Sequence, residues 1–527
     1  MALESLDLFD WWVIACLAGV AWIWVHRWRQ RNYKGPRTWP VLGCIIEQAR
    51  NFDVLHDWLL HYFRHLSTFS VPMMSINNTF TVDPANVEHI LKSNFHNYPK
   101  GERLSERFFD MMGDGIFNVD GEKWVRQRKV AVLEFSSSKL RDHSTKAFRL
   151  KALKLLDVLR HLSQLKQPVD MQDLFMRLTL DSICEVGFGV DPETLSNDLP
   201  AVPFANAFDE ANRLIIRRYV DILWKVKRAL NLGSEARLRR CVQVVNEFIY
   251  GVIVERRAEF KETKFHHTER ADLLSRFMSV PNQDGQPYSN RDLRDVIINF
   301  IIAGRDTTAL TLTWLFSMLC KHPMVVKNIL KEVSSVLGEQ TVKPAQNCAE
   351  VDGPLQTSRI ESIDNCDETE FANLLTYQAL NRMSYLHACI TEALRLYPAV
   401  PLETKIAVSD DIFPDGTKIK AGNFVSYVPY SMGRLEYIWG PDAMEFKPER
   451  WLKDGHFQPQ SPFKLTAFQA GPRMCLGKDS AYLQMKITTL LLLKFFSFKL
   501  ADDCPSKYSM MVVLYMAGGL KTLVTPL

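Results

Sequence analysis

A lone cysteine in a loop shaped by glycine and proline, close to the carboxyl end, constrains this chain more than any other feature. The loop spans residues 468–477, carries Cys475, and leads into a helical pattern. A helix amino terminus presents unpaired backbone N–H groups, whose positive potential favours a thiolate over a thiol. Gly471 and Gly477 permit the backbone to approach a flat ligand closely, and Arg473 can pair with a carboxylate at its edge. These are the requirements of an anionic sulfur that binds haem iron, although a buried structural cysteine is the ordinary alternative.

The remaining cysteines and the composition exclude several classes of protein. Ten cysteines in 527 residues are too few and too irregularly spaced for a disulfide scaffold. The chain contains no CxxC pair, so a zinc ribbon and a thioredoxin-type site are excluded. A net charge of +4 without a long basic stripe argues against nucleic acid as a partner. The content of 47% hydrophobic and 24% charged residues is typical of a folded globular protein.

The cysteine loop is similar to a known haem-binding sequence. Its pattern, Phe-x-x-Gly-x-Arg-x-Cys-x-Gly, resembles the haem-binding loop of cytochromes P450, with Phe468, Gly471, Arg473, Cys475 and Gly477 at the fixed positions. The resemblance implies that Cys475 is the proximal iron ligand of haem b and that Arg473 contacts a haem propionate, with the glycines and Phe468 shaping the loop. It also implies the fold of that family, which is mainly α-helical with small β-sheets.

A second motif lies upstream of the loop. Glu392 and Arg395 are three apart in a helical pattern and therefore share one side of a helix, where an ordinary surface ion pair is the simplest interpretation. A Pro-Glu-Arg triplet at 448–450 ends in Arg450. In the resembling family these three residues form a buried, mutually satisfied structural network on the haem side of the core.

A third group of residues would contact the cofactor's carboxylates. Trp124 and Arg128 are four apart on one face of a predicted helix, a spacing that arises often by chance. The resemblance implies that both contact haem propionates and that Lys405 is a further contact.

The longest helical pattern, 292–321, contains a segment that suits a helix poorly. A capping box formed by Ser289 and Asp292 predicts its start, and Pro323 predicts its end. Glycine, aspartate and two threonines occur together at 304–308, where a helix interior normally avoids them. Such a conflict indicates either a functional site or a structural kink.

The resemblance assigns catalysis to this segment. It implies that Thr307 hydrogen-bonds to oxygen bound at the haem and that Asp306 supplies protons for O–O bond cleavage. Both residues favour a true monooxygenase over a non-catalytic haem sensor and over isomerases and lyases that act on lipid hydroperoxides. No dinucleotide-binding or Walker-type motif occurs, so the expected electron source is a separate NADPH–cytochrome P450 reductase.

The amino terminus predicts a membrane anchor. Residues 11–25 carry no charge, acidic residues precede them, and basic residues follow. The basic flank is expected to stay in the cytosol, which predicts a single-pass protein of the endoplasmic reticulum with a lumenal amino terminus. We therefore expect an anchor at 1–33, a proline- and glycine-rich hinge at 34–43, and one haem-thiolate monooxygenase domain at 44–527. Within that domain, strands at 69–76 and 80–82 are predicted to join at Asn77 and Asn78.

The substrate is suggested by finer resemblance. Motifs at 401–405, 414–416, 430–435 and 446–452 are similar to those of plant fatty-acid hydroxylases, and 97–101 points to the long-chain ω-hydroxylases of cutin and sporopollenin synthesis. The expected substrates are O₂ and a long-chain fatty acid. A terpenoid or a sterol would also suit an apolar channel. The segments expected to face the substrate are 108–117, 204–224, 299–303, 400–406 and 510–515.

Overall fold

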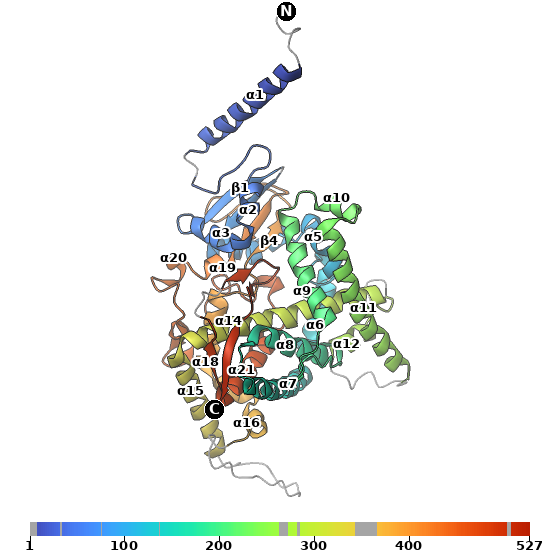
Figure 1. The fold of residues 1–527 in the computed structure, drawn as a ribbon, viewed down its shortest axis with the longest axis vertical. Coiled ribbons are helices and arrows are strands. Elements are labelled where there is room, and N and C mark those ends of the chain that lie inside the picture. Colours follow the sequence, from blue (N-terminus) through green and yellow to red (C-terminus); the bar gives the residue numbers. More distant parts are fainter. Residues whose placement is uncertain are drawn as a thin grey trace, which may run out of the picture.

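The computed structural model describes residues 8–31, 34–74, 76–135, 137–262, 272–281, 285–342, 366–502 and 507–527. These residues form a mainly helical body with small sheets at its margins, as the sequence predicts (Figure 1). Residues 1–7 and 32–33 of the predicted anchor lie outside the described part.

The α-helices have the following bounds in chain order: α1 Leu8–Arg29, α2 Ile45–Arg50, α3 Leu55–Phe63, α4 Pro84–Glu88, α5 Glu102–Met112, α6 Gly121–Phe135, α7 Ser138–Gln164, α8 Met171–Phe188, α9 Pro203–Ile216, α10 Trp224–Ala229, α11 Gly233–Glu262, α12 Leu273–Ser279, α13 Asn290–Ile301, α14 Thr307–Lys321, α15 Pro323–Val342, α16 Glu368–Leu374, α17 Tyr377–Arg382, α18 Ser384–Leu396, α19 Pro429–Met432, α20 Glu436–Trp439 and α21 Lys478–Phe495. Short 3₁₀ or π turns complete the helical structure: η1 Phe52–Val54, η2 His89–Ser93, η3 Phe95–Asn97, η4 Arg217–Tyr219, η5 Ile302–Asp306, η7 Pro448–Trp451 and η8 Gly471–Arg473.

The largest described sheet has the strand order β1-β2-β7-β4, with β2 and β7 parallel and the other pairs antiparallel. A second sheet has the order β10-β13-β3, and three two-stranded ribbons pair β11 with β12, β5 with β6, and β8 with β9. The strands are β1 Thr68–Met73, β2 Ile76–Thr81, β3 Val169–Asp170, β4 Glu403–Ile406, β5 Asp411–Ile412, β6 Lys418–Ile419, β7 Phe424–Tyr427, β8 Leu452–Lys453, β9 His456–Phe457, β10 Phe496–Leu500, β11 Tyr508–Ser509, β12 Tyr515–Met516 and β13 Lys521–Pro526.

The predicted turn between the first two strands is wrong. Asn77 and Asn78 lie inside β2, where they pair with Pro72 and Val71 of β1. The chain reverses earlier, and Met74 adopts a left-handed φ of 55°. Asn78 is buried, and its side-chain oxygen accepts a hydrogen bond of 3.0 Å from Ser426 on β7. A contact between strands distant in sequence therefore overrides the local preference of asparagine for turns.

The helix predicted at 292–321 is one rod with an internal defect. Its start is the predicted capping box, in which Ser289 and Asp292 exchange hydrogen bonds, and α14 ends at Lys321, before Pro323. Between α13 and α14 the backbone widens into the π-helical turn η5, at the segment that the sequence singles out. π turns of this kind are often found at functional sites. The rod crosses the body, and α14 packs against α8, α18 and α21 (Figure 1).

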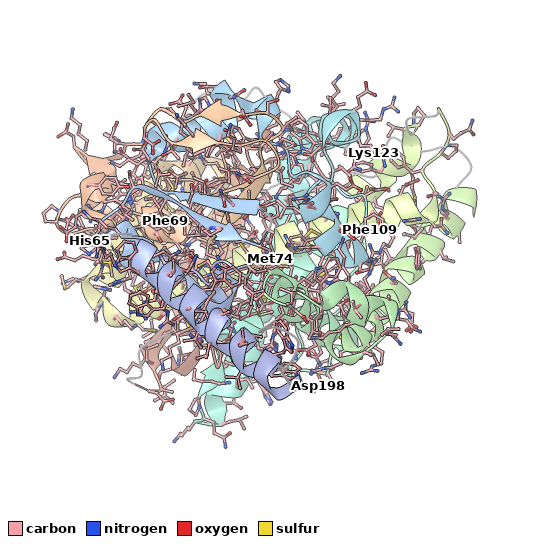
Figure 2. The ribbon with its side chains drawn as sticks, turned by 90° about the horizontal axis from the view of Figure 1, so that it is seen from above. His65, Phe69, Met74, Phe109, Lys123 and Asp198 are labelled. Carbon is pink, nitrogen blue, oxygen red and sulfur yellow. The ribbon has the colours of Figure 1, made fainter. Side chains whose placement is uncertain are left out.

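Helix α1 projects from one end of the body (Figure 1). Its carboxyl-terminal part is joined to the hinge segment, since His26 hydrogen-bonds to Thr38 over 3.1 Å and Arg27 stacks on the ring of Trp39. Seen from above, the end beneath α1 carries β1, with Phe69, and α5, with Phe109 (Figure 2). No single helix in the described residues has both the length and the hydropathy to cross a bilayer. The pair Asn290–Lys321 and Pro323–Gly338, bent by 108°, meets this criterion when taken together, by length and composition only.

Candidate active site

One cavity of about 420 Å³ brings most of the predicted site residues together. Cys475 lies on its wall, and Thr307, on the rod formed by α13, η5 and α14, lines the same space. The other predicted site residues that line it come from α6, β4 and the cysteine loop: Trp124, Arg128, Lys405, Phe468, Arg473 and Gly477. Gly471 and Asp306 do not line the cavity: Gly471 packs against η2, and Asp306 faces a buried ion pair.

The loop before α21 holds Cys475 at the cavity wall. The Cys475 N–H donates to the carbonyl of Phe468 over 2.9 Å, which closes the loop on itself. Gly471 has a φ of 64°, and a Cβ there would lie 1.9 Å from the carbonyl oxygen of Leu91. The glycine is therefore needed for close packing of the loop against η2.

The charge state of Cys475 depends on what occupies the cavity. Burial raises the pKa of its thiol, and this effect exceeds the opposing effects of the Gly477 N–H, Arg128 and Lys478. The N–H of Gly477, at the amino-terminal cap of α21, favours the thiolate, and in the protein alone burial outweighs this effect. A bound metal ion would deprotonate the thiol directly.

A cluster of cations surrounds Trp124 beside the loop. The guanidinium of Arg473 lies 4.6 Å from the Trp124 ring centroid and that of Arg128 lies 5.7 Å from it. Arg473 pairs with Asp120 over 2.5 Å, and Arg128 donates to the carbonyl of Met474 over 2.7 Å. The structure thus places both predicted arginines and the tryptophan in one basic corner of the cavity.

Lys405 extends this corner from β4. Its side chain is 3% exposed, and its Nζ lies 3.8 Å from Glu403, which Lys100 approaches more closely at 3.0 Å. Burial lowers the pKa of Lys405 to about 7, with a further lowering by Lys100 and an opposing effect of Glu403. A buried, weakly paired ammonium of this kind is suited to an anionic ligand group.

Thr307 faces the cavity where the rod is widened. Its hydroxyl donates to the carbonyl of Ala303 over 2.6 Å, one turn back. Gly304 lines the cavity as well, but a Cβ on it would lie 2.6 Å from Ile183 of α8, so helix packing requires the glycine.

Asp306 faces away from the cavity. It is fully buried, pairs with Arg305 over 2.9 Å and accepts a hydrogen bond of 3.2 Å from Asn212. Arg305 also pairs over 2.6 Å with Asp209, whose side chain is 34% exposed. Burial raises the pKa of Asp306, and Arg305 opposes the rise. The Asp306 carboxyl group is therefore linked through Arg305 to Asp209, which reaches solvent.

The predicted network of Glu392, Arg395 and Arg450 is present, and its members lie outside the cavity lining. Glu392 and Arg395 are 0% exposed and form two hydrogen bonds of 2.7 and 2.8 Å. Arg450 approaches Glu392 at 3.4 Å, and Trp451 donates to the same carboxylate over 2.8 Å. Arg395 also donates to the carbonyls of Ala443 and Glu445, so this buried charge is fully satisfied.

All five segments predicted to face the substrate reach the cavity. Apolar side chains dominate its lining away from the basic corner, with contributions from Phe108, Ile116, Phe117, Ile216, Val220, Phe300, Ile302, Val400, Leu402, Met510, Met511 and Val513. The cavity therefore suits a hydrophobic molecule next to Thr307 and Cys475.

Comparison with known proteins settles the family. The sequence model described as Cytochrome P450 matches residues 33–351 and 362–522. The chain belongs to the cytochrome P450 family. It is 50% identical to cytochrome P450 704B1 of Arabidopsis thaliana, over 97% of this chain and 98% of the relative. It is 44% identical to cytochrome P450 704C1 of Pinus taeda, over 100% and 99%, and 39% identical to cytochrome P450 86B1 of Arabidopsis thaliana, over 94% and 86%.

Cytochromes P450 are monooxygenases that carry haem b with a cysteine thiolate ligand, and the residues of this chain fit that group. The cavity offers one sulfur donor at its wall, and three cations, Arg128, Lys405 and Arg473, line it nearby. These cations would hold the two propionates of haem, as predicted from the resemblance.

The pKa of Lys405 leads to a testable prediction. Pairing with a propionate raises this pKa above about 7, so haem binding takes up a proton at higher pH. The affinity of the apoprotein for haem should therefore fall as pH rises above 7, by up to about tenfold per unit. Lys405→Arg keeps a cation that does not titrate and should remove this dependence. Haem titration of the apoprotein between pH 7 and 9 measures it; equal pH profiles for both proteins would contradict the assignment.

Sequence reasoning missed several residues that shape the site. Asp120 is the carboxylate partner of Arg473, and Arg305 and Asp209 connect Asp306 to the surface. A further cation, Arg107 on α5, lines the cavity. Arg305 lies within the 304–308 segment that the sequence singles out, whereas Asp120, Asp209 and Arg107 stand in no motif that distinguishes them from other charged residues.

Proposed function

We propose that this cytochrome P450 hydroxylates long-chain fatty acids at the terminal methyl group. Hydroxylation of this kind yields cutin and sporopollenin precursors. The observation that supports this most is the single apolar cavity that joins Cys475 and Thr307 to aliphatic and aromatic side chains from five segments. A terminal C–H bond has no chemical activation, so selectivity must come from positioning of the chain. Motifs at 401–405 and 446–452, shared with plant fatty-acid hydroxylases, support the same substrate class.

In this proposal Cys475 would bind the haem iron, and Trp124, Arg128, Lys405 and Arg473 would hold the propionates. The haem supplies activation of O₂ and insertion of one oxygen atom into the C–H bond. The Thr307 hydroxyl, on the cavity wall, holds a proton near the reacting oxygen. Asp306 would supply protons for O–O bond cleavage, and its carboxyl group lies beside the Arg305–Asp209 pair, whose aspartate reaches solvent.

The chain is further proposed to be anchored in the endoplasmic reticulum membrane by residues 1–33, with a hinge at 34–43 and the catalytic domain 44–527 in the cytosol. Helix α1 stands clear of the body, and Trp12, Leu17 and Trp24 are 70%, 64% and 67% exposed (Figure 1). The basic residues after it favour a cytosolic body and a lumenal amino terminus. The electrons come from NADPH through a membrane-bound reductase.

The test is incubation of the full-length holoenzyme in vesicles with reductase, O₂ and hexadecanoic or octadecanoic acid, with and without NADPH. Mass spectrometry should find the ω-hydroxy acid only when NADPH is present. Consumption of a lipid hydroperoxide without NADPH, with no hydroxylation of the acid, would support an isomerase or lyase instead. Turnover of a sterol or terpenoid, but not of either acid, would also overturn the proposal.

A further inference from the structure

Arg107 is a cation on the cavity wall that forms no ion pair within the described residues. It lies on α5, and its Nε and Nη1 atoms are buried without a hydrogen-bond partner among the described residues. A buried guanidinium with idle donors is unfavourable, because the protein has removed water and supplied no acceptor. Other lining cations differ: Arg473 pairs with Asp120, and Arg128 donates to a carbonyl.

The acidic residues near Arg107 are committed elsewhere. Glu106, the adjacent residue, pairs with Lys225 over 2.6 Å. Asp110, one turn further along α5, pairs with Arg218 over 2.6 Å and with Arg228 over 2.7 Å. The local carboxylates therefore hold α5 against η4 and α10 and leave Arg107 facing the cavity.

Two aromatic rings fix the Arg107 guanidinium. Its carbon lies 4.8 Å from the ring centroid of Tyr219 on η4 and 5.4 Å from that of Phe424 on β7. Contacts of this kind engage the flat face of guanidinium and leave the N–H groups along its edge free. Tyr219 also lines the cavity. Edge N–H groups in a fixed plane match the two oxygens of a carboxylate.

The position of α5 suits a contact with the end of a long substrate. Helix α5 lies near the end of the body from which α1 projects, whereas α21, which begins just after Cys475, lies in the other half (Figure 1). Arg107 and Cys475 nevertheless line the same cavity. An acyl chain whose anionic group is held at α5 would extend along the apolar lining toward Thr307.

We propose that Arg107, assisted by the Tyr219 hydroxyl, binds the carboxylate of the fatty-acid substrate and so determines which carbon reaches the haem. This inference rests on the proposed function and deepens it, because it supplies the positioning that a terminal C–H bond requires. Arg107 is a specificity-determining residue and takes no part in the chemistry.

The test compares hexadecanoic acid with its methyl ester, which has the same chain but no charge. Binding to the holoenzyme is followed by the substrate-induced change of the Soret band, and products are identified by mass spectrometry. Arg107→Gln should weaken binding of the acid by about 10- to 100-fold and leave the ester within about twofold. Its products from the acid should spread from the terminal carbon to in-chain positions. Arg103→Gln removes the same charge from an exposed position on α5 and is the matched control. It should leave binding of both the acid and the ester unchanged.

Arg107→Lys and Tyr219→Phe cover the case in which Arg107→Gln does not load haem. Both should weaken binding of the acid less than Arg107→Gln does, and both should leave binding of the ester unchanged. Equal weakening of acid and ester, or unchanged binding and products in all variants, would overturn the inference. If the wild-type protein binds the acid through Arg107 but never hydroxylates it, the proposed function fails while the carboxylate site stands.

Discussion

Replacing Glu392 with glutamine will lower the free energy of unfolding by about 3–5 kcal/mol, because it leaves the buried charge of Arg395 without its carboxylate. Glu392 also accepts hydrogen bonds from Trp451 and from the Lys447 N–H, so one substitution weakens several contacts. Urea denaturation followed by tryptophan fluorescence, with the haem content of the purified protein, measures the loss.

Two variants make the Glu392 result interpretable. Glu88→Gln removes the carboxylate from an exposed pair with Lys92 and should cost less than about 1 kcal/mol. Trp451→Phe removes one hydrogen bond to the Glu392 carboxylate and part of a buried ring, and should cost about 1.5–3 kcal/mol, so it remains measurable if Glu392→Gln does not fold. A loss for Glu392→Gln no larger than that for Glu88→Gln would show that the buried network does not stabilise the fold.

The second large effect is expected at the rod. Thr307→Val removes the hydroxyl on the cavity wall at nearly constant volume and should lower hydroxylation by about 10²–10⁴-fold, because a positioned proton donor is lost. NADPH consumption should continue, with the reduced oxygen released as hydrogen peroxide instead of entering the substrate. The ratio of hydroxy acid formed to NADPH consumed is the measurement.

Thr307→Ser should restore most of the coupling between NADPH and product, since it keeps the hydroxyl. Thr313→Val is a matched control, because Thr313 makes the same bond to the carbonyl one turn back but is buried away from the cavity. Coupling that stays at the wild-type value in Thr307→Val would remove Thr307 from the proton path.

The parts of the site that could be predicted from sequence are local or carried by motifs. The cysteine loop is marked by glycine and proline within ten residues, and the defect at η5 by glycine, aspartate and threonine inside a helical pattern. The pairing of Glu392 with Arg450, which are 58 residues apart, was predictable only through the family resemblance. The capping box at Ser289 and Asp292 and the proline at 323 also predicted the ends of the long rod, because both signals act locally.

Other features depend on tertiary context that no local pattern contains. The orientation of Asp306 away from the cavity follows from its pairing with Arg305 and Asn212. The Arg107 N–H groups lack a partner because the neighbouring carboxylate of Glu106 pairs with Lys225, and only the assembled fold determines this pairing. Asn77 and Asn78 favour a turn in isolation, yet pairing with β1 keeps both in a strand, and Asn78 also pairs with β7.

The central claim is that the sulfur of Cys475 is the thiolate ligand of haem iron. Its most direct test is the absorption spectrum of the reduced holoenzyme under carbon monoxide, compared with that of Cys475→Ser. We expect the wild-type protein to show the long-wavelength Soret band that only a thiolate-ligated ferrous–CO complex gives. In Cys475→Ser this band and the hydroxylation activity should both be lost. A folded, haem-loaded wild-type protein that lacks this band, or a variant that keeps it, would contradict the account.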